Sequence, residues 1–366
     1  MKIICDKDQL YSGISIAGRA ISTRTTMPVL EGIYMEALGD SLHLVCTDMT
    51  IGIETSIPAQ VIDKGTSVVP GKLFTEFARK LPSGSIELDF HENMVDIKAN
   101  GSEASLHTLS PEDFPSLPEV LKAGEIQVRQ DRLRNMINRS IFSAATDESR
   151  PILTGVLLEL DGEEARLVAL DGYRLALCRT GLDADYGKQS AIVPSSSFAE
   201  IAKLPMNDQN TKLYISGAHL IAENDGTRVI TRLLEGEFIK YSQILPADWQ
   251  TQVTINKSRL EASIDRASTL AREANSNLIT FDIRDGMIYL SSKSEMGSVN
   301  EELACTVEGK ELQIAFNARY LSDVMKNIDD EEILMKFNTN VSPCIITPFE
   351  GNAYIYLVLP VRIYTQ

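Results

Sequence analysis

The sequence has few of the residues from which catalytic, metal and redox centres are built. Its 366 residues include five cysteines, four histidines and one tryptophan. The cysteines lie far apart, without a Cys-x-x-Cys pair, and an odd number of thiols cannot form a complete disulfide framework. The histidines have no partner at metal-ligand spacing. We therefore expect buried free thiols and strand histidines, and neither a metal nor a cofactor. The residues are Cys5, Cys46, Cys178, Cys305 and Cys344, and His43, His91, His107 and His219.

Long apolar runs and nucleotide-binding motifs are missing as well. No stretch approaches the length of a signal peptide or a membrane span, so we expect a cytoplasmic protein. The segment 65–72 resembles a phosphate-binding loop only faintly, because its glycine spacing is one residue too long and Leu73 stands where Ser or Thr is needed. There is no Gly-x-Ser-x-Gly elbow either. An enzyme is therefore the weakest of the function classes.

What the chain does contain is an internal repeat. The run 167–175 reads Leu-Val-Ala-Leu-Asp-Gly-Tyr-Arg-Leu, and a similar run, 44–48, ends at an Asp that lies 123 residues earlier. The segment 288–292 occupies the third position. This period is too long for a solenoid unit, so we interpret it as three similar domains in a row. We expect these domains at 1–122, 123–249 and 250–366.

Each copy opens with a short strand and an amphipathic helix, and carries a second helix further on. Strands are expected at 2–5, 125–129 and 252–255, first helices at 7–20, 130–141 and 257–273, and second helices at 71–81, 195–204 and 317–327. Five Asx-Gly pairs predict tight turns between strands, at Asn100, Asp161, Asp171, Asp225 and Asp285. The predicted fold class is α+β, with three similar domains that each pack two helices on antiparallel sheets.

The negative net charge is not distributed evenly along the chain. A net charge of −16 argues against a nucleic-acid partner, yet the six predicted helices together carry +7 and everything else −23. The helix propensity of Lys and Arg is one explanation for this bias. The other is functional, because equivalent helices of the three copies share it. If all six helices face one way, they form a weakly positive surface on an acidic body.

Several short motifs occur in a specific order along the chain. They are Arg24–Leu30, Thr47-Asp48, Ser105–Leu109 followed by Asp113-Phe114-Pro115, Asp171–Leu175, Ile192–Pro194 and Leu359–Arg362. Together with the triplication, they resemble the bacterial DNA polymerase sliding clamps, the beta subunits of the replicative polymerase, over essentially the whole length. The resemblance implies a head-to-tail homodimer closed into a ring with pseudo-sixfold symmetry. Its helices would line the hole and face the phosphates of encircled double-stranded DNA without reading its sequence.

The resemblance also implies partners. They are the alpha-type subunit of DNA polymerase III, the delta subunit of the ATP-dependent clamp loader, and other proteins with a clamp-binding motif, such as repair polymerases, mismatch repair proteins and ligase. The protein would be a non-catalytic processivity factor without a membrane partner. One alternative stays open, which is a scaffold that presents the same peptide pocket without encircling DNA.

Three groups of residues follow from the resemblance. The partner-peptide pocket would be lined by Leu153, Leu170, Gly172, Tyr173, Arg174, Leu175, Ile239, Ile244, Val358, Leu359, Pro360, Val361 and Arg362. The DNA-facing residues would be Arg24, Lys72, Arg79, Arg132, Arg134, Arg139, Arg150 and Lys203, and the dimer interface would use Ala104, Leu106, Thr269 and Leu270. The chain departs from the family at Ile239, where Pro is familiar, at Tyr173, where His occurs, and at Pro151 and Ile152, where aromatic residues occur. From the residues alone, Asp171-Gly172 reads as a plain hairpin turn.

Overall fold

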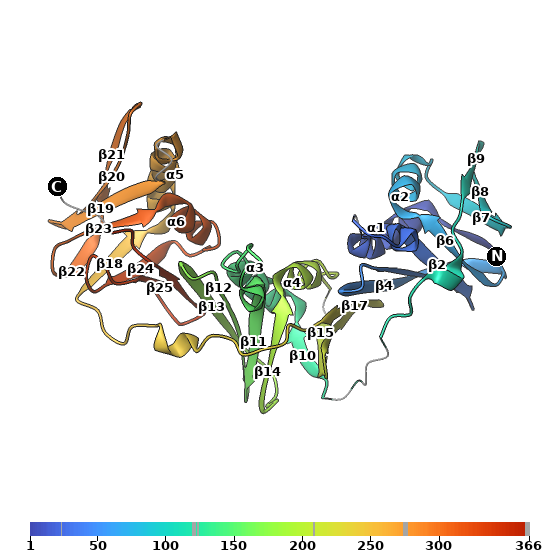
Figure 1. The fold of residues 1–366 in the computed structure, drawn as a ribbon, viewed down its shortest axis with the longest axis horizontal. Coiled ribbons are helices and arrows are strands. Elements are labelled where there is room, and N and C mark those ends of the chain that lie inside the picture. Colours follow the sequence, from blue (N-terminus) through green and yellow to red (C-terminus); the bar gives the residue numbers. More distant parts are fainter. Residues whose placement is uncertain (23, 119–121, 123, 208, 274–276, 363–366) are drawn as a thin grey trace. The chain divides into compact units, whose positions relative to one another are not determined.

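The structure, a computed structural model, describes residues 1–22, 24–118, 122, 124–207, 209–273 and 277–362. They form two compact units (Figure 1). The first unit consists of Met1–Asp131 with Glu200–Leu233, and the second of Arg132–Ala199 with Leu234–Gln366. The middle copy of the repeat therefore contributes to both units. No helix among the described residues is long and apolar enough to cross a membrane.

All six predicted helices are present. They are α1 (Lys7–Ala17), α2 (Gly71–Lys80), α3 (Gln130–Ile141), α4 (Ser195–Ile201), α5 (Lys257–Glu273) and α6 (Ala318–Met325). Asx side chains fix where three of them begin, because each accepts a hydrogen bond from an otherwise unpaired backbone N–H of the first turn. Asp6 accepts from Asp8 N at 2.9 Å, and Asn317 accepts from Arg319 N at 3.0 Å. Asn256 does the same for α5.

Several helices are shorter than the sequence predicted, and this changes the charge count. The chain leaves α1 at Ala17 and continues as a 3-10 turn, Gly18–Ala20. Arg19, Lys203 and Lys326 therefore lie just past the helices, which carry +4 and not the predicted +7. Cations are favoured at these positions because the last carbonyls of a helix carry partial negative charge. Arg19 Nε donates to Ile16 O at 3.1 Å.

The first unit contains two antiparallel sheets. One has the order β5 (Gln60–Asp63), β1 (Lys2–Asp6), β7 (Ser85–His91), β8 (Met94–Ala99) and β9 (Ser102–His107). The other has the order β10 (Ile126–Arg129), β15 (Asn210–Ser216), β16 (His219–Asn224), β17 (Thr227–Arg232), β4 (Ile51–Pro58), β3 (Ser41–Thr47), β2 (Gly32–Leu38) and β6 (Gly65–Pro70). Strands of the first and second copies thus share one sheet. We call the β4·β17 pairing the first joint. At one end of this joint the buried hydroxyls of Thr55 and Thr227 lie 2.9 Å apart.

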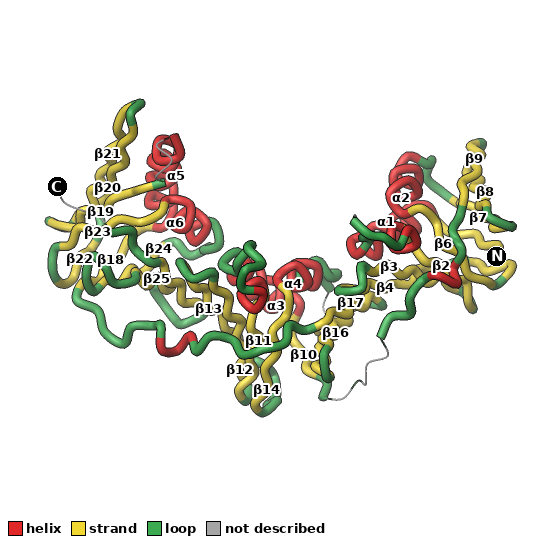
Figure 2. The backbone as a smooth tube through the Cα atoms, in the orientation of Figure 1, coloured by secondary structure: helices red, strands yellow, loops and turns green. Residues whose placement is uncertain are grey.

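The second unit repeats this arrangement (Figure 2). Its large sheet has the order β14 (Lys188–Pro194), β11 (Gly155–Asp161), β12 (Glu164–Leu170), β13 (Arg174–Gly181), β26 (Tyr354–Val358), β25 (Cys344–Pro348), β24 (Glu332–Phe337), β18 (Thr251–Asn256) and β22 (Thr306–Gly309). Its small sheet has the order β21 (Gly297–Ala304), β20 (Met287–Ser294), β19 (Leu278–Arg284) and β23 (Leu312–Asn317), with α5 packed against it. The β13·β26 pairing joins the second copy to the third, and we call it the second joint.

Three of the five predicted Asx-Gly turns have the expected backbone. At Asn100, Asp225 and Asp285 both the Asx residue and the following glycine have positive φ, as a primed hairpin turn requires. At Asp161 and Asp171 only the glycine does, so the prediction of a primed turn is wrong there. Asp171 instead folds its own side chain back onto the turn, as described below.

The cysteines are all free, and four of them are buried as predicted. Cys305 is only half-buried, since it follows the exposed end of edge strand β21. Burial raises the pKa of the Cys305 thiol to about 11 and that of Cys5 to about 12. Both thiols are thus protonated at neutral pH and are poor nucleophiles.

The alternation of buried and exposed residues on α2 yields a prediction about stability. Phe74 is 1% exposed, whereas its neighbour Leu73 is 52% exposed. Phe74→Ala should lower the free energy of unfolding by about 3–5 kcal/mol, because it leaves a cavity. Leu73→Ala, the matched control, should cost no more than about 0.5 kcal/mol. Urea unfolding followed by circular dichroism measures both, and equal losses would contradict the assignment of Phe74 to the core.

Candidate functional site

A groove of about 440 Å³ lies within the second unit, where three segments meet. These segments are the loop that leads into the 3-10 turn η4 (Pro151–Thr154), the turn between β12 and β13, and the start of α6. The groove is lined by Ala144, Ala145, Thr146, Asp147, Ser149, Arg150, Leu153, Asp171, Gly172, Tyr173, Arg174, Arg319 and Tyr320. Four of the predicted pocket residues, Leu153, Gly172, Tyr173 and Arg174, are therefore brought together here.

The β12–β13 turn is held by the side chain of Asp171. Its Oδ1 accepts hydrogen bonds from the backbone N–H of Tyr173 at 2.8 Å and of Arg174 at 3.0 Å. Gly172 between them has a φ of 95°, a conformation that side chains disfavour. The reading of Asp171-Gly172 as a turn is thus correct. The same turn also presents Tyr173, which is 59% exposed, at the groove surface.

Arg174 links the groove to the second joint. The residue is 7% exposed, and its guanidinium pairs with Asp171 Oδ2 at 3.0 Å and with Asp323 of α6. It also lies over the rings of Phe142 and Tyr320, at 5.5 and 4.9 Å from their centroids. A buried cation needs such partners because desolvation is costly. Arg174 therefore holds α6 against the start of β13.

Two tyrosines stack in the groove. The rings of Tyr173 and Tyr320 lie 5.8 Å apart and nearly parallel. Burial raises the pKa of Tyr320, and the carboxylate of Asp171 adds to this effect. The backbone N–H of Leu359 donates to Tyr173 O at 2.9 Å, so the chain after β26 runs beside the same turn.

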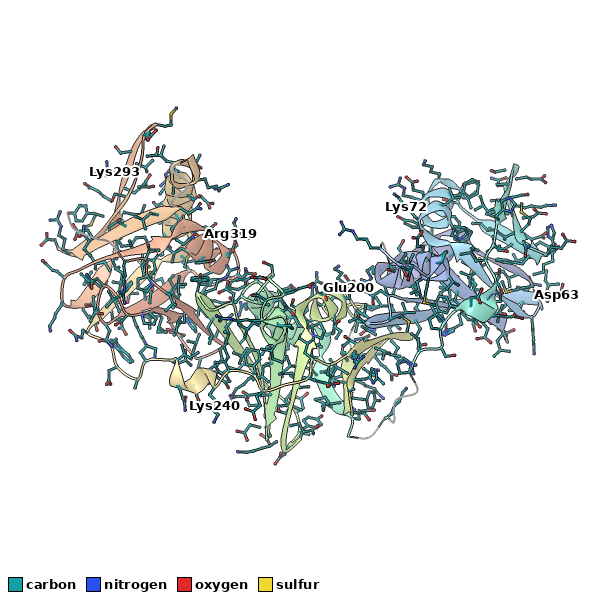
Figure 3. All side chains as sticks on the ribbon, viewed as in Figure 1. Asp63, Lys72, Glu200, Lys240, Lys293 and Arg319 are labelled. Carbon is teal, nitrogen blue, oxygen red and sulfur yellow. The ribbon has the colours of Figure 1, made fainter. Side chains whose placement is uncertain are left out.

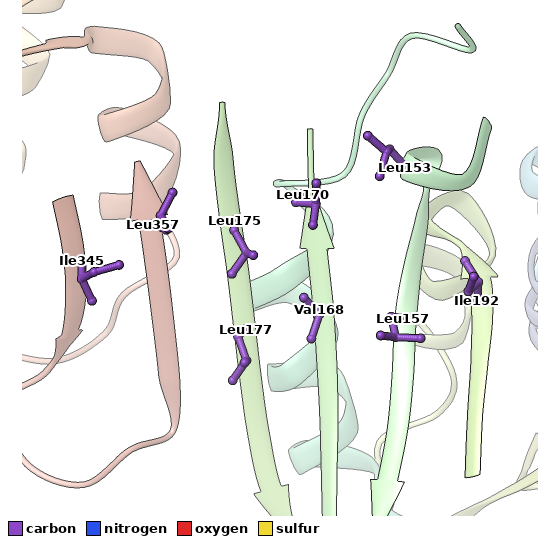
Figure 4. Close-up of a cluster of buried hydrophobic side chains, with 9 residues drawn as sticks. All are labelled: Leu153, Leu157, Val168, Leu170, Leu175, Leu177, Ile192, Ile345 and Leu357. Atoms are coloured by element: carbon purple, nitrogen blue, oxygen red, sulfur yellow. The ribbon is translucent and has the colours of Figure 1, made fainter. Parts of the chain in front are cut away.

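An apolar cluster continues from Leu153 across the large sheet (Figure 4). Its buried members are Leu153, Leu157, Val168, Leu170, Leu175, Leu177, Ile192, Ile345 and Leu357. They come from η4, β11, β12, β13, β14, β25 and β26, so both copies that meet at the second joint contribute. Leu359 packs against the cluster from the chain end. Four predicted pocket residues are therefore part of this apolar cluster or pack against it, namely Leu153, Leu170, Leu175 and Leu359.

The segment between the second and third copies lies along this cluster. Phe238, Tyr241 and Leu245 pack against it, while Ile239 and Ile244 are 39% and 38% exposed. The two predicted pocket residues of this segment are thus available at the surface, and their neighbours hold the segment in place.

The remaining predicted pocket residues occupy different environments. Val358 is fully buried and pairs with Arg174 in the second joint. Pro360 forms a bridge to Phe316, and Val361 N donates to Ala315 O at 2.8 Å, so this stretch follows β23. Arg362 is exposed.

Asp171, Arg319 and Tyr320 also line the groove, although they were not among the predicted pocket residues. Asp323 pairs with Arg174, and Phe238 and Tyr241 pack against the apolar cluster, and none of the three was predicted. A signal existed for Arg319 and Tyr320, because Asn317 marks the start of the helix that carries them. For Asp323 no signal existed, since only the β13·β26 pairing brings α6 to Arg174.

The predicted DNA-facing residues fall into three groups. Arg24, Lys72, Arg79 and Arg134 are exposed (Lys72 is labelled in Figure 3). Arg132, Arg139 and Lys203 bond within the chain, as Arg139 Nη2 does to Asp329 Oδ2 at 3.0 Å. Arg150 lines the groove.

Three similar α+β domains joined sheet to sheet, with a groove beside one joint, define a protein of the DNA-clamp class. The family models for the DNA polymerase III beta subunit match residues 1–118 (N-terminal domain), 127–240 (central domain) and 242–362 (C-terminal domain). The chain belongs to this family of beta sliding clamps.

Relatives in sequence and solved structures support the same family. The beta sliding clamps of Staphylococcus epidermidis and Staphylococcus aureus are each 32% identical, with both chains covered completely. The DNA polymerase sliding clamp of Bacillus subtilis superposes with a TM-score of 0.96 at 30% identity, covering 100% of both chains. The DNA polymerase III beta subunit of Thermotoga maritima gives 0.94 at 27% identity, covering 99% of this chain and 100% of that one. The protein is a DNA sliding clamp that serves polymerase processivity, and it is not an enzyme.

The contact between Tyr241 and Glu159 yields a pH prediction. The Tyr241 hydroxyl donates to Glu159 Oε2, and burial, followed by this carboxylate, raises the pKa of Tyr241 to about 12. Because the folded-state pKa lies above the ordinary value of about 10, this stabilisation is complete below about pH 10 and disappears as pH rises toward 12.

The urea midpoint should therefore fall between about pH 10 and about pH 12, and Tyr241→Phe should remove part of that fall. Tyr214→Phe provides a comparison from the first unit, because burial and Glu125 raise that pKa to about 12 as well. A fall that is unchanged in Tyr241→Phe would show that the tyrosine does not hold the segment.

Proposed function

We propose that two copies of this chain close head to tail into a ring around double-stranded DNA, through β9 of one chain and β21 of the other. The observation that carries this proposal is the repetition of the joints. In the first joint the fourth strand of one domain, β4, pairs with the last strand of the next, β17. In the second joint β13 and β26 hold the same positions. The strands that come next in this series are β21 and β9.

Both strands have an open edge. Among the described residues, β9 bonds only to β8 and β21 only to β20, so each offers unpaired backbone groups along one side. Carrying the register of the two internal joints onto this pair sets Val299 opposite the partner's Ala104. When β9 of each copy meets β21 of the other, the same contact occurs twice and closes the assembly.

The side chains of the second joint support the predicted interface residues. Phe142, just past α3, contacts Tyr356 of β26 with ring centroids 5.6 Å apart. The repeat places Thr269 and the partner's Ala104 at the equivalent positions, and Leu270 and the partner's Leu106 beside them. Thr269 is exposed, while Leu106 and Leu270 are half-buried, so a second copy would cover apolar surface there.

The repeat also supports the domain limits 1–122, 123–249 and 250–366, since each joint falls between two of them. Around the DNA we assign the exposed cations Arg24, Lys72, Arg79 and Arg134 to phosphate contacts, with Arg132, Arg139 and Lys203 contributing more weakly because they have intrachain partners. Such contacts attract phosphates without reading bases. A cytoplasmic location follows from this role.

The groove and its apolar cluster are the proposed docking site for partner proteins. Their clamp-binding segments would carry a Gln and two apolar side chains, and the partners would be the alpha-type polymerase subunit, the clamp loader delta subunit and repair, mismatch repair and ligase proteins. Two or three buried side chains contribute about 1.5–3 kcal/mol each. After the cost of ordering a flexible segment, this corresponds to micromolar affinity, about −8 kcal/mol.

The ring predicts topological retention on DNA. Protein placed on a nicked circular duplex by a clamp loader with ATP should co-elute with the circle at high salt and be lost when the circle is cut. Binding to linear duplex should be weak and salt-sensitive. The control is the double variant Leu106→Asp with Leu270→Asp, which should be monomeric by light scattering and not retained. Retention that survives linearisation would favour the non-ring scaffold.

The proposed docking site predicts a loss of peptide binding that leaves the dimer intact. Removal of residues 359–366 takes away the strand continuation that bonds to Tyr173, so the truncated protein should no longer bind the Gln-containing peptide in calorimetry. Its dimer mass should be unchanged, because the β9 and β21 edges are intact. Undiminished peptide affinity after truncation would place the docking site elsewhere.

A further inference from the structure

The two joints of the chain have the same strand register. In the second joint Leu175 of β13 lies opposite Leu357 of β26, and both side chains belong to the apolar cluster (Figure 4). In the first joint Gly52 of β4 lies opposite Ile230 of β17. Each pair lies beside the turn that leads into β4 or β13 and is the second bonded pair from that end. The position that a leucine fills in the second joint therefore has no side chain in the first.

The turns that lead into these two strands also have the same construction. Asp48 Oδ1 accepts hydrogen bonds from the backbone N–H groups of Thr50 and Ile51, both at 2.8 Å, as its counterpart does in the β12–β13 turn. Met49 occupies the place of Gly172 and has a positive φ as well, 75°. The first joint therefore has the backbone of the docking groove with different side chains.

A side chain of the connecting segment fills the space at Gly52. Leu117, at the end of the first copy, packs against the buried cluster of Tyr214, Ile221 and Ile230. A Cβ on Gly52 would lie 2.5 Å from Leu117 Cδ2, which is closer than two nonbonded carbons approach. The leucine therefore occupies the volume that a side chain at position 52 would need.

The segment around Leu117 contacts the first unit much as a bound peptide would. Leu117 is half-buried, whereas its neighbours Ser116 and Pro118 are exposed. Phe114 anchors the segment, because its ring packs against that of Tyr34 with centroids 5.2 Å apart. An extended stretch of chain thus inserts one apolar side chain beside the joint and leaves its flanks in solvent.

Two exposed methionines occupy the positions of groove residues. Met27 precedes the 3-10 turn η2 (Pro28–Glu31), as Arg150 precedes η4, and it is 41% exposed. Met49, in the place of Gly172, is 61% exposed. Methionine side chains adapt to apolar partners of different shapes. The side chains at these two positions favour an apolar segment over a charged one.

We propose that the first joint is a second docking site, for short peptide segments with an uncharged apolar anchor, and that Leu117 keeps this site closed. The inference rests on the groove of the second joint being the docking site for partner peptides. A segment from outside must displace Leu117, which has the advantage of belonging to the same chain. The unaltered chain therefore binds one segment, and the first joint becomes available when the leucine is removed.

The test compares the unaltered full chain with Leu117→Ala, using a peptide that contains a Gln and two Leu residues. In calorimetry the unaltered protein should bind one peptide per chain and the variant two, because alanine leaves the space over Ile230 open. A photo-crosslinker beside the second Leu of the peptide should label β13 or β26 in both proteins. Mass spectrometry should find label on β4 or β17 in the variant alone.

Gly52→Ala is a second variant that retains the leucine. Its methyl group would meet only the flexible end of Leu117 and should push it aside, so β4 or β17 should again be labelled, more weakly than in Leu117→Ala. Leu73→Ala is the matched control, because it shortens an exposed leucine on α2 of the same unit. It should bind one peptide and leave β4 and β17 unlabelled.

The label separates this inference from the docking site on which it rests. One bound peptide, with β4 and β17 unlabelled in both Leu117→Ala and Gly52→Ala, would overturn the second site and leave the first standing. Label on β4 or β17 of the unaltered protein would overturn the closure by Leu117. Absence of label on β13 and β26 in the unaltered protein would instead overturn the docking site at the second joint.

Discussion

Backbone hydrogen bonding at sheet edges is the constraint on which the rest of this structure depends. A strand at an edge leaves a row of N–H and C=O groups without partners, and burying such groups unpaired is costly. The chain meets this constraint by letting one domain complete the sheet of the next, as β17 does for β4 and β26 does for β13. Each large sheet therefore continues from one domain into the next. This explains why the middle copy is shared between two compact units.

The second joint also positions the groove. Arg174 sits in the first bonded pair of β13·β26, opposite Val358, and its guanidinium reaches Asp323 on α6. Segments of two domains can form one surface here because the hydrogen bonds between β13 and β26 and a buried ion pair hold them in position against each other. Removing one partner of a buried ion pair lowers the free energy of unfolding by more than the intact pair contributes to it. The reason is that the remaining charge is buried without compensation. The groove and the joint are thus one structural unit, although they belong to different stretches of sequence.

The sequence predicted local structure well and long-range structure poorly. The six helices and the antiparallel sheets follow from the periodicity of apolar residues, which the sequence displays directly. The ends of α1 and α4 were placed too far along, because Arg19 and Lys203 have good helix propensity and yet sit in the turns that follow. Which strands would share a sheet was not predictable, since β4 and β17 are far apart in the chain and pair through backbone atoms that carry no sequence signal.

The groove shows the same difference between what local sequence predicts and what depends on long-range contacts. Gly172, Tyr173, Arg174, Leu153 and Leu175 were all identified by resemblance, although Leu153 lies in the 3-10 turn η4 and Leu175 in β13. The roles of Asp171 and Asp323 depend on geometry, as does the packing of Tyr241 and Phe238. A residue that acts by holding another in place leaves little trace in a single sequence, because many polar side chains could serve at its position.

The contact of Phe142 with Tyr356 has a mechanical consequence. Two aromatic rings pack at the second joint, with a buried arginine beside them, whereas the joint proposed between chains would place Thr269 and the partner's Ala104 at the equivalent positions. Smaller side chains bury less apolar surface and so hold two strands together less strongly. A ring closed by the proposed contact would therefore open between subunits before the second joint separates.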